Sequence, residues 1–136
     1  MSGYEIKKID EMETAFGGAY KRARAELGIE AFGVQVMDFD ANEGRYPEHD
    51  HSWDGQEELY LVLRGSGEIE IEGARHRLDP ETMVRVSAGV KRKVLTGDEP
   101  MRLLAVGGTP GRAYEAPEVS KLGAPDVMPP GASSPS

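Results

Sequence analysis

The feature that most constrains this fold is a series of short apolar segments between residues 31 and 108, each bounded by turn-forming residues. Segment 68–72, EIEIE, is the clearest, because Ile69 and Ile71 face one side of a strand and the glutamates face the other. Similar strand patterns occupy 31–39, 58–64, 74–78, 83–86, 90–95 and 101–108, and no helical pattern interrupts them. Strands at this spacing, with Gly and Pro between them, predict an all-β antiparallel barrel or sandwich.

The N-terminal residues 1–29 are expected to form a segment that packs on this barrel. Ile9, Met12 and Phe16 have helical spacing, which predicts a short helix before the following glycine pair. Segment 19–27 fits a helix by propensity and an edge strand by its alternation of small and charged residues. Both readings remain open for it.

The C-terminal residues 116–136 form a tail in which Pro, Gly, Ser and Ala dominate. We expect its first part to lie extended over the domain or over a neighbouring subunit. From about residue 129 the composition predicts disorder. Residues 30–115 then make up a single barrel domain, which suits a chain of 136 residues.

Composition excludes several kinds of function. The formal net charge is -8, with 24 acidic and 16 basic residues, which argues against nucleic acid or an anionic membrane as partner. The chain has no cysteine, so disulfides and thiolate chemistry are ruled out. The N-terminal residues contain no apolar stretch typical of a secretion signal, and no apolar run is long enough for a bilayer. We therefore expect a cytoplasmic protein.

The strongest functional signal lies in residues 46–65, which read YPEHDHSWDGQEELYLVLRG. His49 and His51 are two residues apart, so an extended backbone places both imidazoles on one face. A carboxylate from Glu57 or Glu58 would complete a set of two histidines and one carboxylate, which leaves coordination positions open. Because strand neighbours point to opposite faces, only one of the two glutamates can join the histidines.

Residues 44–73 resemble the first motif of the cupin superfamily, with a Gly, a His-x-His pair, and a Glu on a strand that ends in Gly. Residues 74–106 resemble the second motif. The resemblance implies a small single-domain cupin barrel, a double-stranded β-helix of the jelly-roll type. The family motif places its Glu seven residues before the closing Gly, and counting back from Gly65 favours Glu58. The spacing from His51 to Glu58 is longer than the family's, so residues 52–56 are predicted to bulge as a loop.

The strand after the histidines also carries an apolar outer face. If Glu58 points inward, Leu59, Leu61 and Leu63 lie on the other side of that strand. Their apolarity predicts that the N-terminal segment or a second subunit covers them. Since cupins are often dimeric, the resemblance favours a homodimer.

One departure from the family pattern divides the functional prediction. The second motif supplies another histidine, and this chain has Arg92 at that position. A guanidinium cannot ligate a metal. In one version, His49, His51 and Glu58 still hold a divalent transition metal such as Fe, Mn, Ni or Zn. In the other, Arg92 replaces the metal, pairs with Glu58 and binds a carboxylate ligand. If Arg92 points out of the barrel mouth instead, it escapes repulsion by a bound metal and can meet an anionic substrate.

Both versions predict a small organic molecule bound in the barrel. Arg92, Tyr60 and Tyr46 are the candidate ligand-binding residues, although core packing explains the tyrosines equally well. If the protein is an enzyme, the resemblance implies a metal-dependent oxygenase, isomerase or decarboxylase, and the sequence does not select among them. The third histidine, His76, is predicted to be a partly buried structural residue.

Overall fold

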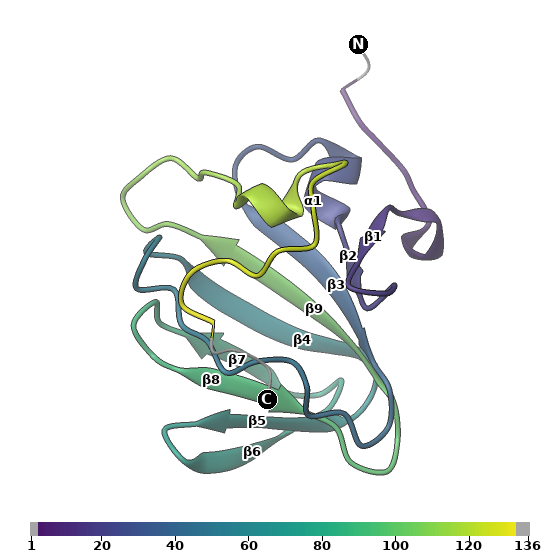
Figure 1. Cartoon of the computed structure of the whole chain (residues 1–136), viewed down its shortest axis with the longest axis vertical. Coiled ribbons are helices and arrows are strands. Elements are labelled where there is room, and N and C mark those ends of the chain that lie inside the picture. The colour runs from purple at the N-terminus through teal and green to yellow at the C-terminus, as the bar shows by residue number, and fades with distance from the viewer. Residues whose placement is uncertain (1–2, 133–136) are drawn as a thin grey trace.

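A computed structural model describes residues 3–132 and shows two antiparallel sheets that enclose one core (Figure 1). The larger sheet has the order β1 (Thr14–Ala15), β2 (Tyr20–Lys21), β3 (Gly33–Phe39), β9 (Met101–Gly108), β4 (Glu57–Gly65) and β7 (Met83–Val86). The smaller sheet has the order β6 (Ala74–Leu78), β5 (Gly67–Ile71) and β8 (Arg92–Leu95). The prediction of an all-β fold is confirmed.

The core lies between the two sheets because strand alternation turns one face of each sheet inward. Ile69 on β5 and Leu103 on β9 are both 0 % exposed, as expected for inward positions of facing strands. Each fully buried aliphatic side chain of this kind contributes about 1.5–3 kcal/mol to stability. The remaining buried apolar residues of this core are Ala15, Tyr20, Met37, Phe39, Tyr60, Val62, Leu78, Val86, Val94, Met101 and Ala105.

The connection from β4 to β5 is tight and requires glycine at Gly65. This residue has a φ of 80°, and an added Cβ would collide with the carbonyl oxygen of Pro100. Only glycine adopts this conformation without strain and leaves room for the neighbouring backbone. The turn brings β5 into the smaller sheet, so the predicted strand boundary at this glycine corresponds to a change of sheet.

The predicted short N-terminal helix is present, but it is α1 (Ala23–Leu27), which follows the glycine pair instead of preceding it. Residues Ile9–Glu11 form only a single 3-10 turn (η1), and the chain then enters β1. Phe16 has a φ of 54°, and the two following glycines also have positive φ. Three such residues in succession end a right-handed helix. They reverse the chain, and Ala15 pairs with Tyr20 in a hairpin.

Segment 19–27 contains both of the alternatives that the sequence left open. Its start is β2, which pairs with β3, and its end is α1 (Ala23–Leu27). The helix stops at Gly28, which adopts the left-handed conformation that commonly ends helices.

No helix among residues 3–132 is long and apolar enough to cross a membrane.

The C-terminal tail runs back across the domain, as Figure 1 shows in yellow. It contains a short 3-10 turn, η2 (Glu118–Ser120), and is held by Arg22, which is only 3 % exposed. Arg22 Nε donates to the carbonyl oxygen of Val119 at 2.9 Å, and Nη2 donates to that of Ala124 at 2.7 Å. The extended path matches the expectation for the tail's first part. The disorder predicted from about residue 129 falls partly on 133–136, which lie outside the described residues.

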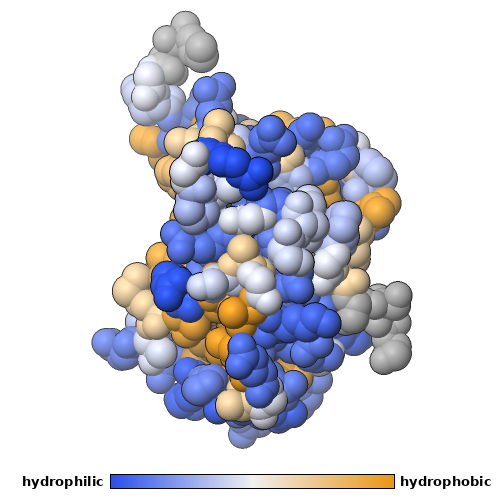
Figure 2. Space-filling model, turned by 90° about the vertical axis from the view of Figure 1, so that its left-hand side faces the viewer, coloured by the Kyte–Doolittle hydropathy of each residue, from blue (hydrophilic) through white to orange (hydrophobic). Residues whose placement is uncertain are grey.

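The outer face of β4 is only partly covered by the described part of the chain. Leu63 is 40 % exposed, and Leu59 and Leu61 are half-buried. Figure 2 shows apolar residues that reach the surface on one face, surrounded by hydrophilic ones. Exposed apolar surface of this kind is typical of interaction sites, and the homodimer remains a prediction.

Candidate metal centre

The two histidines lie on an extended segment that pairs with β8 at its N-terminal end. His49 N donates to the carbonyl oxygen of Arg92 at 3.0 Å, and Arg92 N donates to that of His49 at 2.9 Å. His51 N donates to the carbonyl oxygen of Ala88 at 2.7 Å. This pairing keeps the backbone extended, so the two imidazole rings lie on one side with their centroids 5.4 Å apart.

Glu58, and not Glu57, joins the histidines. Glu58 on β4 is 7 % exposed, whereas Glu57 is exposed with its carboxylate 3.7 Å from Nη1 of Arg85. The loop predicted for residues 52–56 is present as a turn, in which the backbone nitrogen of Gly55 donates to the carbonyl oxygen of His51. The turn accommodates the extra residues between His51 and Glu58. The side chain of Glu58, the second residue of β4, therefore points to the inward face.

The ligand atoms of His49, His51 and Glu58 all lie within 4.8 Å of one another. His51 Nε2 is 3.1 Å and His49 Nε2 is 3.8 Å from Glu58 Oε1. Nitrogen and oxygen ligands bonded to one ion at about 2.1 Å, with angles between octahedral and tetrahedral values, are about 3.0–3.4 Å apart. The separation of His51 and Glu58 lies in this range, and that of His49 and Glu58 exceeds it by about 0.4 Å, so a small shift of His49 completes the set.

The other ring nitrogen of each histidine fixes the orientation of the ring. His51 Nδ1 lies 3.0 Å from Asp54 Oδ1, and His49 Nδ1 lies 3.2 Å from the carbonyl oxygen of Pro47. Both partners can only accept, so each Nδ1 carries a hydrogen and each neutral ring turns the lone pair of Nε2 toward Glu58. A bare lone pair facing a carboxylate is repelled, so a proton or a metal cation belongs between them. The donor set thus fits a metal ion.

Asp54 is a residue of the candidate site that the sequence reasoning missed. Its carboxylate accepts from His51, and it also accepts from Gln56 Nε2 at 2.8 Å. A carboxylate bound to the outer nitrogen of a metal-binding histidine makes that ring a stronger ligand. The available signal was an aspartate three residues after His51, inside the predicted loop.

The electrostatics of the cluster favour a charged Glu58. Burial of this carboxylate opposes ionisation, but the neighbouring His49 and His51 and the hydroxyl of Tyr60 outweigh it and hold the pKa of Glu58 well below its ordinary value. Tyr60, itself 2 % exposed, donates its hydroxyl to Glu58 Oε1 at 2.6 Å. Burial lowers the pKa of His51, but Glu58 and Asp54 overcome this and leave it raised. The two carboxylates therefore favour the protonated form of His51 when no metal is bound.

Arg92 points into the barrel and is 0 % exposed. Its Nη1 donates to the carbonyl oxygen of Val90 at 2.9 Å, and its Nη2 lies 3.5 Å from Glu58 Oε1. Among the described residues, its Nε and Nη2 have no hydrogen-bond partner. Arg92 is not among the residues that line the cavity at the histidines. Arg92 therefore compensates the charge of Glu58 from the side of the carboxylate that faces away from this cavity.

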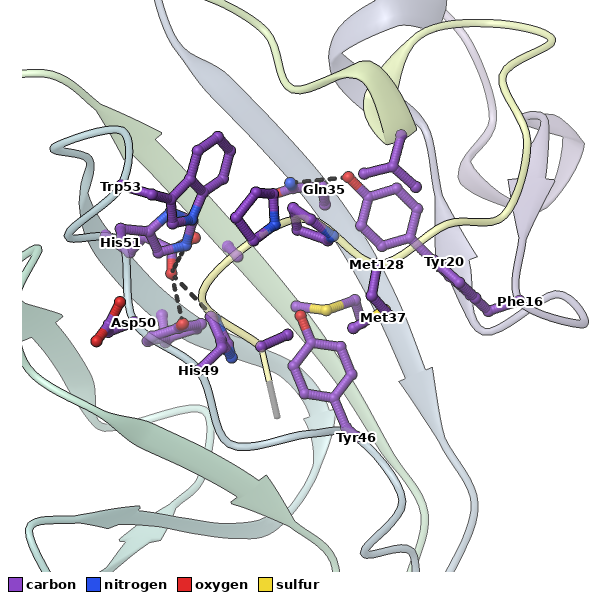
Figure 3. Close-up of a pocket in the computed structure, with 17 residues that line it drawn as sticks. Phe16, Tyr20, Gln35, Met37, Tyr46, His49, Asp50, His51, Trp53 and Met128 are labelled. Atoms are coloured by element: carbon purple, nitrogen blue, oxygen red, sulfur yellow. Dashed lines mark hydrogen bonds and ion pairs between the residues drawn. The ribbon is translucent and has the colours of Figure 1, made fainter. Parts of the chain in front are cut away.

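The cavity in front of the cluster has a volume of about 60 Å³ (Figure 3). Tyr46 and Tyr60 both line it, and Tyr46 packs edge-on against His49 with a centroid distance of 5.5 Å. Trp53 stacks on His51 at 6.1 Å. The prediction that His76 is a partly buried structural residue is wrong, because its side chain is exposed on β6.

The C-terminal tail forms one wall of this cavity, which the sequence did not indicate. Met128, Pro129, Pro130 and Ala132 line it together with the histidines. The tail is fixed there because Asp50 N donates to the carbonyl oxygen of Gly131 at 3.1 Å. The tail thus covers the mouth of the barrel above His49, His51 and Glu58.

Comparisons with known proteins agree with this architecture. The sequence model of the cupin domain matches residues 35–107, which is more than half of the chain. A solved cupin protein from Bacteroides fragilis is similar over 86% of this chain and 93% of its own, with 21% identity and a TM-score of 0.69. Comparison with curated proteins finds no match.

Two further solved structures carry names that describe an activity. A sugar phosphate isomerase of the cupin superfamily from Silicibacter pomeroyi is 19% identical over 76% of this chain and 75% of its own, with a TM-score of 0.62. The DMSP lyase DddQ from Ruegeria pomeroyi is 25% identical over 67% of this chain, with a TM-score of 0.53, and this chain spans only 45% of it. The likeness to the isomerase shows a shared fold.

Proposed function

The chain belongs to the cupin family, and we propose that it binds a divalent transition metal through His49, His51 and Glu58 and presents it to a small organic ligand. The observation that carries the proposal is the convergence of three ligand atoms within 4.8 Å. It is supported by Asp54 and Pro47, which orient the two imidazoles from outside. A tridentate set of this kind leaves coordination positions open for a ligand.

The charge of the assembled site favours an anionic ligand. Glu58 and Asp54 contribute two negative charges, whereas Arg92 and a divalent ion contribute three positive ones. With His51 neutral as a ligand, one positive charge remains uncompensated, and burial makes this imbalance costly. An oxygen anion of the ligand would neutralise it.

The bound metal would supply Lewis-acid chemistry, polarising an oxygen of the ligand. The chain's own residues hold and shield that position. Tyr60 donates to Glu58 and keeps the carboxylate oriented, while Tyr46 and Trp53 limit the access of water on two sides. Metal-dependent isomerase, decarboxylase or oxygenase activity on an anionic organic molecule is consistent with this arrangement, and the proposal selects none of them.

A metal-free cupin is the second candidate. It is favoured by Arg92, because the guanidinium lies 3.5 Å from Glu58 and supplies a cation where the family motif has a histidine. In that case Arg92 and a protonated His51 together balance Glu58 and Asp54, and the site needs no metal for charge neutrality.

Metal analysis distinguishes the two candidates. Untagged protein, purified without chelator, is loaded with Fe, Mn, Ni or Zn, and its metal content is measured by mass spectrometry. We expect one equivalent in the wild type and none in His49→Ala or His51→Ala. His76→Ala is the matched control, because His76 is exposed on β6, and it should bind like the wild type. A double variant of His49 and His51 that retained metal would refute the site, and a wild type that binds none would favour the metal-free candidate.

A further inference from the structure

A second, larger cavity lies beside the candidate metal centre. Its volume is about 380 Å³, and its wall is mainly apolar, with Phe16, Ala19, Phe39 and Pro47 among the residues that form it. These side chains come from the β1–β2 hairpin, from β3 and from the segment that leads to the histidines. We call this cavity the apolar chamber.

The apolar chamber adjoins the cavity at the candidate metal ligands. Phe16, Met37, Tyr46 and Met128 line both of them (Figure 3). Only side chains therefore separate the two spaces. Met128 belongs to the tail, and methionine has three rotatable bonds, so it can change its shape at low cost.

The cavity at the metal ligands is too small to hold an organic ligand alone. It measures about 60 Å³, whereas pockets for small molecules are usually about 300–1,000 Å³. A ligand whose head reaches His49, His51 and Glu58 must extend beyond this space. The apolar chamber adjoins it and is of the required size.

The polar groups at the edge of the apolar chamber are already paired within the protein. Arg45 binds Glu43 through two contacts of 2.9 and 3.0 Å. Asp38 accepts from Arg102 Nε at 2.8 Å and lies 3.1 Å from Lys21 Nζ. A polar ligand body would have to break these pairs, whereas an apolar body needs only the apolar wall.

We propose that the site takes an amphipathic ligand, with an anionic metal-binding head at His49, His51 and Glu58 and an apolar body in the apolar chamber. The inference rests on the proposed function, because the head is held by the metal. It deepens that function by naming the ligand class. The apolar body displaces the side chain of Met128, which lies where the two cavities meet.

Straight-chain hydroxamates test this inference, since they combine an anionic chelating head with an apolar chain of adjustable length. The Kd of acetohydroxamate, hexanohydroxamate and octanohydroxamate is measured by calorimetry on zinc-loaded protein. Burial of each methylene is expected to tighten binding by about fourfold, until the chamber is full. Octanohydroxamate should therefore bind at least tenfold more tightly than acetohydroxamate.

A chamber-filling substitution localises the effect. Ala19→Phe places a ring in the apolar chamber and leaves the cavity at the metal untouched, because Ala19 lines only the chamber. It should abolish the chain-length dependence without changing the Kd of acetohydroxamate. Ala74→Phe makes the same change at an exposed position on β6 that lines neither cavity, and it should retain the dependence.

The outcomes separate this inference from the proposed function. Equal affinity for short and long hydroxamates in the wild type would overturn the inference and leave the metal site standing. A chain-length dependence that persists in Ala19→Phe would place the apolar body elsewhere and also overturn it. Failure to load zinc at all would refute the proposed function, and the inference with it.

Discussion

Replacement of Arg92 by methionine is expected to tighten metal binding at His49, His51 and Glu58. The guanidinium is fully buried and lies 3.5 Å from the carboxylate that would ligate the ion. It therefore repels any cation at that carboxylate. Methionine fills a similar volume; removing one partner of the buried Arg92–Glu58 pair lowers the stability of the metal-free protein, and a metal ion at Glu58 restores a cation beside the carboxylate. Glu58 keeps its hydrogen bond from Tyr60, so it is not left without a partner.

The size of the effect follows from the geometry. Arg92 Nη2 is 3.5 Å from Glu58 Oε1, and a metal–oxygen bond adds about 2.1 Å, so ion and nitrogen are at most about 5.6 Å apart. A divalent ion that displaces the proton of His51 adds one net charge. One unit of repulsion at this distance costs about 3 kcal/mol at an effective dielectric of 20 and about 0.7 kcal/mol in water. The expected tightening is thus roughly threefold to 150-fold.

Competition with a coloured zinc chelator at neutral pH measures the change in affinity. Arg92→Lys is the matched control, because it keeps the positive charge and should keep an affinity close to that of the wild type. Circular dichroism and metal stoichiometry establish that both variants are folded and bind one ion. If folded Arg92→Met bound zinc no more tightly than the wild type, the electrostatic reasoning about this site would be refuted.

Two further predictions concern the contacts that hold the termini and the hairpin. Arg22→Ala should lower the free energy of unfolding in urea by about 3–5 kcal/mol, because it removes a buried charge with four hydrogen-bond partners. Arg24→Ala is the control and should lower it less, because Arg24 donates to Ile29 and not to the tail. Burial opposes the ionised form of Asp38, but Arg102 and Lys21 outweigh it and lower its pKa, so its stabilising effect is present above the ordinary value of 3.8 and is lost as the pH falls through the folded pKa. Because a third of the Asp38 side chain is exposed and solvent screens its ion pairs, Asp38→Asn should cost about 1–2 kcal/mol at neutral pH and make stability less dependent on pH in acid. An unchanged slope between pH 2 and 5 would contradict this.

The barrel could be predicted from the sequence because its signals are local. Strand alternation in residues 68–72 placed Ile69 in the core, and it is completely buried. The His-x-His pair and the closing Gly65 likewise depend on residues close in sequence. Each of these patterns records which side of one strand meets water, so no long-range information was needed.

The N-terminal segment shows where this reasoning stops. The spacing of Ile9, Met12 and Phe16 fits a helix, but Phe16 and the two glycines after it adopt positive φ. The hairpin they form buries Ala15 and Tyr20 against the edge of the larger sheet. The partner for that burial, β3, lies more than ten residues away, so local spacing could not reveal it.

The position of the tail depends on still longer contacts. Arg22 binds backbone carbonyls about a hundred residues further along the chain. The composition of the tail predicted an extended course but contained no signal for its partner. Gly131 shows why the path is specific: an added Cβ there would lie 2.7 Å from both Asp50 and Trp53. The tail therefore packs closely against the segment that carries His49 and His51.

For Arg92, the sequence predicted the change of residue type at the site but not the direction of the side chain. The sequence showed that a guanidinium replaces an expected imidazole, but its side chain could have pointed outward into solvent. Pairing of β8 with β5, where Ile71 faces Arg92, fixes the register that turns it inward. Once buried beside Glu58, it adds a positive charge that no ordinary three-ligand site carries. A metal bound here must share Glu58 with a cation, so the open coordination positions favour an anion more strongly than they would with a third histidine.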